Sequence, residues 1–119
     1  MTSVDPKKRL LIFIVAYNAQ ATIEGVLSRI PLGILENYSV EVLIIDDSSL
    51  DDTFHEGRRA SQKLNLPFPV TVLKNPINQG YGGNQKIGYH YAIEFGFDYV
   101  ALIHGDGQYA PEALPDLSL

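Results

Sequence analysis

The amino-acid sequence predicts an α/β domain with an open, mostly parallel sheet and helices on both faces. Four short apolar runs rich in β-branched residues alternate with stretches of helical spacing. None of the runs alternates cleanly between apolar and polar residues, which is typical of strands covered on both faces. Each connection between runs is long enough to hold a helix, so consecutive strands are expected to be parallel with right-handed crossovers.

Each expected element follows from a local pattern. The predicted strands are residues 10–16, 40–45, 70–73 and 99–103. The predicted helices are the apolar stripe of Ile23, Val26, Leu27 and Ile30, the more polar stretch 53–64, and residues 84–95 with Ile87, Tyr91 and Phe95 four apart. Residues 110–114 open like a further helix, because Pro111 falls in the first turn with an acid beside it.

Length and composition limit the possible functions. The chain has 119 residues, 45% of them apolar, and neither Cys nor Trp, which indicates one globular domain at 1–119 without disulfides or thiolate metal sites. Its formal charge of -5 argues against nucleic acid as a partner. The longest apolar run is far too short to span a membrane. We expect a cytoplasmic location, with any membrane association made through regions or partners outside this chain. We also expect the domain to be incomplete at its C-terminus, because the helix that opens at 110–114 has barely begun at Leu119 and the last of four parallel strands is often an interior strand of a larger sheet.

Polar residues gather where the predicted strands end. In an open parallel sheet, ligands bind beyond the carboxyl ends of the strands. The segments that follow the four predicted strands, 17–20, 46–52, 74–83 and 104–108, are all polar or rich in glycine, and four of the 14 acidic residues fall between Asp46 and Asp52. The sequence therefore predicts one binding site at this edge of the sheet.

Asp106 is a candidate metal ligand. It lies between two glycines, and Gln108 follows two residues later, so both side chains can offer oxygen to Mg²⁺ or Mn²⁺. Such a cation can offset the negative charge of a departing diphosphate. The spacing fits equally well with Asp106 capping the turn or helix that follows.

Two adjacent acids, Asp46 and Asp47, follow the second predicted strand. Neighbouring strand residues point to opposite faces, so one carboxylate can face the cleft while the other holds the next loop. A carboxylate in the cleft can accept hydrogen bonds from the N–H groups of uracil or guanine. We assign Asp51 and Asp52 to capping the helix predicted at 53–64.

The segment 75–84 is rich in glycine and leads into a helix that carries Lys86 in its predicted first turn. Backbone N–H groups, a helix N-terminus and a lysine together can bind a diphosphate. The segment is not a dinucleotide-binding fingerprint, because position 85 is Gln and the loop follows the third strand. The chain also lacks the G-x-x-x-x-G-K-[ST] pattern of a P-loop.

Four ordered motifs identify a family resemblance. They are Val-Ala-Tyr-Asn at 15–18, Ile-Asp-Asp-Ser-Ser-Leu-Asp-Asp-Thr at 45–53, Asn-Gln-Gly-Tyr-Gly-Gly at 78–83 and Gly-Asp-Gly-Gln-Tyr-Ala-Pro-Glu at 105–112. Across residues 9–117 the chain resembles the nucleotide-binding half of a family 2 glycosyltransferase with the Rossmann-like GT-A fold. The resemblance is closest to the dolichol-phosphate mannose synthase-like, or polyprenyl-phosphate glycosyltransferase, branch.

The resemblance implies a donor, an acceptor and a set of site residues. The donor is a UDP-linked or GDP-linked sugar, and the acceptor is a polyprenyl phosphate or a growing glycan. The implied nucleotide-binding residues are Ala16, Tyr17, Asn18, Asp47, Gly80, Lys86 and Asp106. Asp106 and Gln108 are the implied ligands of Mg²⁺ or Mn²⁺. The family's catalytic base is expected beyond Leu119.

The chain departs from the family pattern at three positions. Ala16 and Ala19 stand where the family usually has Pro and Glu, and His104 replaces the first Asp of the D-x-D metal motif. A histidine nitrogen can bind Mn²⁺ but suits Mg²⁺ less well, so His104 is a further candidate ligand that would shift the choice of metal. The alternative hypothesis from these departures is a catalytically inactive nucleotide-sugar-binding or assembly module. A receiver-type phospho-acceptor domain fits less well, because its paired acids follow the first strand.

Overall fold

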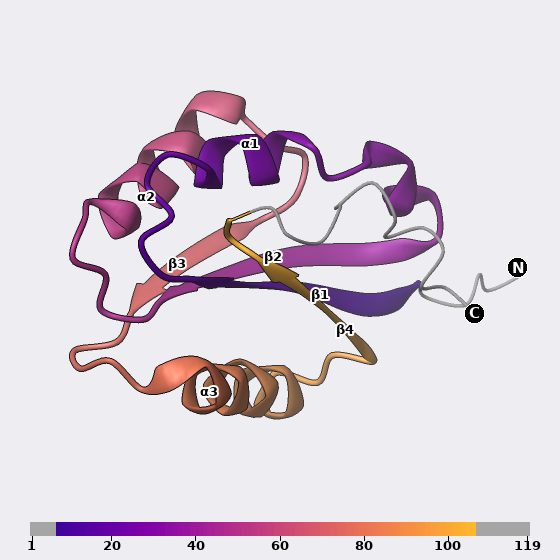
Figure 1. Cartoon of the computed structure of the whole chain (residues 1–119). Coiled ribbons are helices and arrows are strands. Elements are labelled where there is room, and N and C mark those ends of the chain that lie inside the picture. Colours follow the sequence, from indigo (N-terminus) through magenta and orange to yellow (C-terminus); the bar gives the residue numbers. More distant parts are fainter. Residues whose placement is uncertain (1–6, 107–119) are drawn as a thin grey trace, which may run out of the picture.

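The computed structural model describes residues 7–106, which form a single four-stranded sheet with three α-helices and one 3₁₀ helix (Figure 1). The strands are β1 (Lys8–Ala16), β2 (Tyr38–Asp46), β3 (Val70–Lys74) and β4 (Tyr99–His104). The helices are α1 (Ile23–Ser28), η1 (Leu32–Glu36), α2 (Thr53–Leu64) and α3 (Gly80–Glu94). All strand pairs are parallel, in the order β3-β2-β1-β4. The predicted fold class is confirmed.

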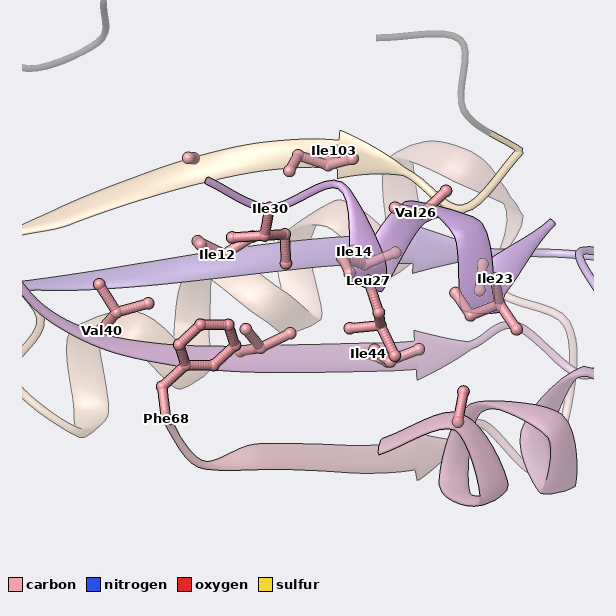
Figure 2. Close-up of a cluster of buried hydrophobic side chains, with 14 of the residues drawn as sticks. Ile12, Ile14, Ile23, Val26, Leu27, Ile30, Val40, Ile44, Phe68 and Ile103 are labelled. Carbon is pink, nitrogen blue, oxygen red and sulfur yellow. The ribbon is translucent and has the colours of Figure 1, made fainter. Parts of the chain in front are cut away.

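The sheet is covered on both faces. Figure 1 shows α1 and α2 above the sheet and α3 below it. The central strand β1 is buried from Leu10 to Ala16, because helices lie over both of its faces. In the larger core, Ile23 and Leu27 of α1 belong to the same cluster as Ile12, Ile14 and Ile44 of the sheet (Figure 2). Full burial of each such side chain contributes about 1.5–3 kcal/mol to stability.

Helix α3 contacts the opposite face through small residues. Its buried residues are Asn84, Gly88 and Ala92, spaced four apart. Of the predicted stripe, Tyr91 is partly buried against the smaller core, as expected, whereas Ile87 and Phe95 are exposed and their predicted burial is wrong. The physical reason is that the helix approaches the sheet too closely for large side chains to lie between them.

The start of one helix differs from the prediction, and one further helix was not predicted. Helix α3 begins at Gly80 instead of residue 84, so the glycine-rich segment forms its first turn and Lys86 lies in its second turn. The 3₁₀ helix η1 between α1 and β2 was not predicted. The helix expected at 110–114 lies outside the described residues. Over 7–106, no helix is both long and apolar enough to span a membrane.

Candidate functional site

A cavity of about 590 Å³ lies at the carboxyl edge of the sheet. The strand register creates it, because Ala16 of β1 lies opposite Asp46 of β2, and Val15 lies opposite His104 of β4. The segments that follow the strands therefore leave the sheet at one edge, with the loops after β1, β2 and β3 on the left of Figure 1. This volume is in the range of small-molecule sites.

The cavity brings together most of the residues that the sequence singled out. Its lining includes Ala16, Tyr17, Asp47, Gly80, His104 and Asp106. Asn18 and Lys86, although both are described, do not line the cavity, and the Lys86 side chain is exposed on α3. Gln108 lies outside the described residues. The lining also includes Asn78, Tyr81 and Asn84, which the sequence analysis did not select.

Asp47 is the buried acid of the cavity, only 4% exposed. Its Oδ1 accepts hydrogen bonds from the backbone N–H of Gln79 at 2.7 Å and from Nδ2 of Asn75 at 3.0 Å. Its backbone carbonyl accepts a third, from Nδ2 of Asn78, at 3.0 Å. The two bonds to Oδ1 offset the cost of burying the carboxylate, and all three hold Asp47 at the cavity wall.

Asp46 takes the other role expected for the pair. Its Oδ1 accepts hydrogen bonds from the backbone N–H of Ser49, at 3.1 Å, and from the Ser49 hydroxyl. Thus Asp46 holds the loop after β2 while Asp47 faces the cavity. Within the described part of the chain, Oδ2 of Asp46 is buried without a hydrogen-bond partner.

Asn18 connects the loops that follow β1 and β2. Its backbone has the left-handed conformation, with φ of 50°, and its Oδ1 accepts a hydrogen bond from the backbone N–H of Leu50 at 2.9 Å. Its own N–H donates to the Ser49 hydroxyl at 2.8 Å. The side chain is therefore directed to the neighbouring loop, and its effect on the cavity is to fix the backbone next to Tyr17.

The capping prediction holds for Asp51 but not for Asp52. Oδ1 of Asp51 accepts a hydrogen bond from the first N–H of α2, that of Thr53, at 3.1 Å, and Oδ2 accepts one from Gln20 at 3.2 Å. Burial acts to raise the pKa of Asp51, but the hydrogen bonds from Thr53 and Gln20 together lower it. Asp52 occupies the N-cap position, and within 7–106 its side chain makes no capping hydrogen bond. The side chain of Asp51 already accepts the hydrogen bond from the first N–H of α2.

The N-terminus of α3 faces the cavity through Gly80 and Tyr81. Gly80 has φ of 74°, which suits glycine, and its N–H donates to Oδ1 of Asn78 at 2.9 Å. The partial positive charge at the start of this 15-residue helix favours an anion in the cavity. The exposed Lys86, one turn farther along, adds a full positive charge to the same helix.

His104 and Tyr81, which both line the cavity, contact each other. The two rings stack with centroids 5.0 Å apart and planes 10° apart, and the Tyr81 hydroxyl is hydrogen bonded to Nε2 of His104 at 2.9 Å. The position of Tyr81 between two glycines at the strand-end segment is the one sequence signal that could have identified it.

The described residues offer few metal ligands. Asp106 and His104 line the same cavity, and no group of three or more His, Asp and Glu side chains in the described part of the chain could hold a metal ion. A carboxylate and an imidazole fit a cation that takes its remaining ligands from water and phosphate oxygens. A cation bound through Nε2 of His104 would have to displace the Tyr81 hydroxyl.

Comparison with known proteins adds the family. Residues 11–118 match the sequence model described as "Glycosyl transferase family 2". The undecaprenyl-phosphate mannosyltransferase of Micrococcus luteus is 31% identical over 109 residues, covering 92% of this chain and 42% of that protein. The polyprenol monophosphomannose synthase of Mycolicibacterium smegmatis is 28% identical over 116 residues, covering 97% of this chain and 42% of that protein. The dolichol-phosphate mannosyltransferase of Pyrococcus furiosus is 27% identical, covering 92% of this chain and 29% of that protein.

The chain thus spans less than half the length of these relatives. Among solved structures, Staphylococcus aureus TarS superposes with a TM-score of 0.64 at 22% identity, covering 92% of this chain and 19% of TarS, and supports the fold alone. The family predicted from the four motifs is confirmed. Because the family match covers residues 11–118, the chain belongs to glycosyl transferase family 2.

Proposed function

We propose that this chain binds a nucleoside-diphosphate sugar in the cavity at the carboxyl edge of the sheet and forms the donor side of a polyprenyl-phosphate glycosyltransferase. The observation that carries the proposal is the composition of the cavity wall. A buried acceptor, Asp47, lies in the same cavity as the N-terminus of α3 and the carboxylate of Asp106. These groups complement a base, a diphosphate and a cation respectively.

Each residue has a proposed role in holding the donor. Asp47 accepts an N–H of the base, and Tyr17, 49% exposed at the cavity, offers its ring to the base or ribose together with Ala16. Asn18 acts by fixing the loop that carries Tyr17.

The diphosphate would lie toward α3. Gly80 belongs to the first turn of this helix, where the helix dipole favours an anion. Lys86, exposed on the second turn and outside the cavity lining, would add positive charge on the same helix.

A divalent cation would be held by Asp106, with Gln108 and His104 as further ligands. Bound there, Mg²⁺ or Mn²⁺ would neutralise charge that develops on the departing diphosphate. The acceptor in this proposal is a polyprenyl phosphate, whose phosphate oxygen forms the new bond to the sugar as the bond from the sugar to the nucleoside diphosphate breaks. We place the base that activates the acceptor outside this chain, and expect residues 1–119 alone to bind the donor without turnover.

A second candidate is a nucleotide-sugar-binding or assembly module without catalysis. It is favoured by His104, which stands in the place of a carboxylate and is hydrogen bonded to Tyr81. A nucleotide-sugar-binding module differs from the enzyme in metal dependence and turnover, whereas an assembly module does not require nucleotide binding.

The test is calorimetric titration of the folded chain with UDP, GDP and their sugar conjugates, with and without Mn²⁺, beside the Asp106→Asn variant. Binding that strengthens with Mn²⁺ and weakens in the variant supports the donor site of an enzyme. Binding that is indifferent to metal and to Asp106 supports the inactive module. A folded chain that binds none of these nucleotides contradicts the donor site and favours an assembly module.

A further inference from the structure

Three buried polar side chains form one hydrogen-bonded network at the wall of the cavity. Asp47 follows β2, Asn75 follows β3 and Asn84 lies on α3, and they are 4%, 8% and 2% exposed. Nδ2 of Asn75 donates to Oδ1 of Asp47 at 3.0 Å and to Oδ1 of Asn84 at 3.1 Å. Nδ2 of Asn84 donates to the backbone carbonyl of Ile45 at 3.2 Å.

The direction of every bond in this network is fixed by its two ends. A backbone carbonyl can only accept, so the group that Asn84 turns toward Ile45 must be its NH₂, and its oxygen must face Asn75. Asn75 must then present NH₂ to both of its partners. The network therefore delivers a donor to Asp47, and an acceptor cannot take that place without leaving buried groups unpaired.

The donors to the side-chain carboxylate of Asp47 both reach one oxygen. Oδ1 receives the Asn75 amide and the backbone N–H of Gln79, at 3.0 and 2.7 Å, which fills its two lone pairs. Among the described residues no donor reaches Oδ2. Since Asp47 lines the cavity, Oδ2 is the oxygen that remains for a ligand.

We propose that Asn75 and Asn84 are positioning residues that hold Asp47 so that it presents a single acceptor, and that the site therefore selects a base with one ring N–H, uracil or thymine. This inference rests on the proposed function, because it assumes that Asp47 contacts the base. The Watson–Crick edge of guanine presents two adjacent donors, N1–H and N2–H, which match both oxygens of a free carboxylate. Here one of these donors would meet an oxygen that is already saturated. Cytosine presents an unprotonated N3, which a carboxylate repels.

The sharpest test is Asp47→Asn, which preserves size and exchanges one oxygen for NH₂. The two donors at the Oδ1 position hold the amide oxygen there, so NH₂ must face the cavity and can donate to N3 of cytosine. We expect the unaltered chain to bind UDP at least about tenfold more tightly than GDP or CDP, the factor expected from one hydrogen bond to a charged group. In Asp47→Asn, we expect CDP to bind more tightly than UDP. The measurement is calorimetric titration with the three diphosphates, after circular dichroism has verified folding.

Two more variants separate positioning from general damage. Asn84→Ala removes the anchor of the network, so we expect the ratio of UDP to GDP affinity to fall several-fold, which a purely structural loss would not change. Asp52→Asn makes the same chemical change as Asp47→Asn on an exposed side chain at the other end of the same loop, between β2 and α2, and the UDP preference should persist.

The outcomes distinguish the inference from the proposed function. A folded chain that binds GDP as tightly as UDP, or an Asp47→Asn variant that still prefers UDP, overturns the inference and leaves the donor site in place. A folded chain that binds none of the three diphosphates overturns the proposed function itself.

Discussion

Gly88 of α3 lies directly against the ring of Phe13 in β1. A Cβ atom at Gly88 would stand 2.0 Å from Cε2 of Phe13, far inside van der Waals contact. Phe13 is fully buried, so its ring and the packing around it, or the helix, would have to shift to admit the new atom. This contact sets the distance between α3 and the sheet, and with it the height of the helix N-terminus above the cavity.

Gly88→Ala is therefore expected to destabilise the fold. Overpacking a core typically costs about 1–3 kcal/mol, while the better helix propensity of Ala returns about 1 kcal/mol. A Cβ at 2.0 Å puts the variant at the upper end of this range, so we expect a net loss of about 2 kcal/mol in the free energy of unfolding. Urea unfolding followed by circular dichroism measures it.

Gly82→Ala is the matched control on the same helix. No heavy atom lies within 4 Å of a Cβ at Gly82, so only the propensity gain remains and the variant should be at least as stable as the unaltered chain. Equal losses at both positions would mean that contact with Phe13 is not the cause.

The sequence predicts some features of the fold better than others. The four strands were predictable because their apolar runs are continuous, and the site was predictable because polar residues follow each strand. The buried stripe of α3 was not predictable from hydrophobic periodicity. Gly88 and Ala92 allow the helix to approach the sheet because they are small, and a periodicity of large apolar residues does not detect them. The start of α3 was missed for a related reason, since glycines are poor helix formers.

Within the site, the buried polar contacts were the features that sequence patterns could not reveal. Asn75 and Asn84 are typical of loops and helix surfaces, and only the fold brings their amides together beside Asp47. The stack of Tyr81 on His104 joins residues 23 apart on two different elements. Asn18 belongs to a recognised motif, but its contact with the loop after β2 depends on the conformation of both loops.

Asn18→Ala should loosen the loop that carries Tyr17. Alanine disfavours the left-handed backbone at φ of 50°, and the hydrogen bond to the N–H of Leu50 is lost, so we expect a loss of about 1–2 kcal/mol in stability. We also expect weaker nucleotide binding. Asn18→Gly keeps the backbone conformation accessible and should lose less stability than the alanine variant. Denaturant titration and calorimetry measure the two effects.

Asp51 should contribute stability that depends on pH. Its pKa is lowered in the folded chain, so its ionised form stabilises the fold above the unfolded-state pKa, about 3.9, and this contribution is lost as the pH falls through the folded-state value. Asp51→Asn should therefore be less stable than the unaltered chain at pH 7, and the difference should shrink below about pH 4. Urea unfolding at a series of pH values tests this. Asp52→Asn, without a capping bond in the described chain, should show no such trend.

His104→Asp should increase the effect of Mg²⁺ on nucleotide binding. The substitution places a second carboxylate beside Asp106 in the cavity and removes the imidazole that pairs with Tyr81. Because Mg²⁺ prefers oxygen ligands, it should strengthen UDP binding by the variant more than by the unaltered chain, in which we expect Mn²⁺ to act more strongly than Mg²⁺. Calorimetric titration with UDP in EDTA, Mg²⁺ and Mn²⁺ gives these ratios.

Tyr81→Phe separates the metal effect from the loss of the ring pair. Phenylalanine preserves the stack on His104 and removes only the hydroxyl that bonds Nε2. If Nε2 is a ligand, the variant should respond more strongly to Mn²⁺, because no hydroxyl has to be displaced, while its response to Mg²⁺ should stay unchanged. An identical response of the unaltered chain, His104→Asp and Tyr81→Phe to both cations would show that neither residue takes part in binding a metal.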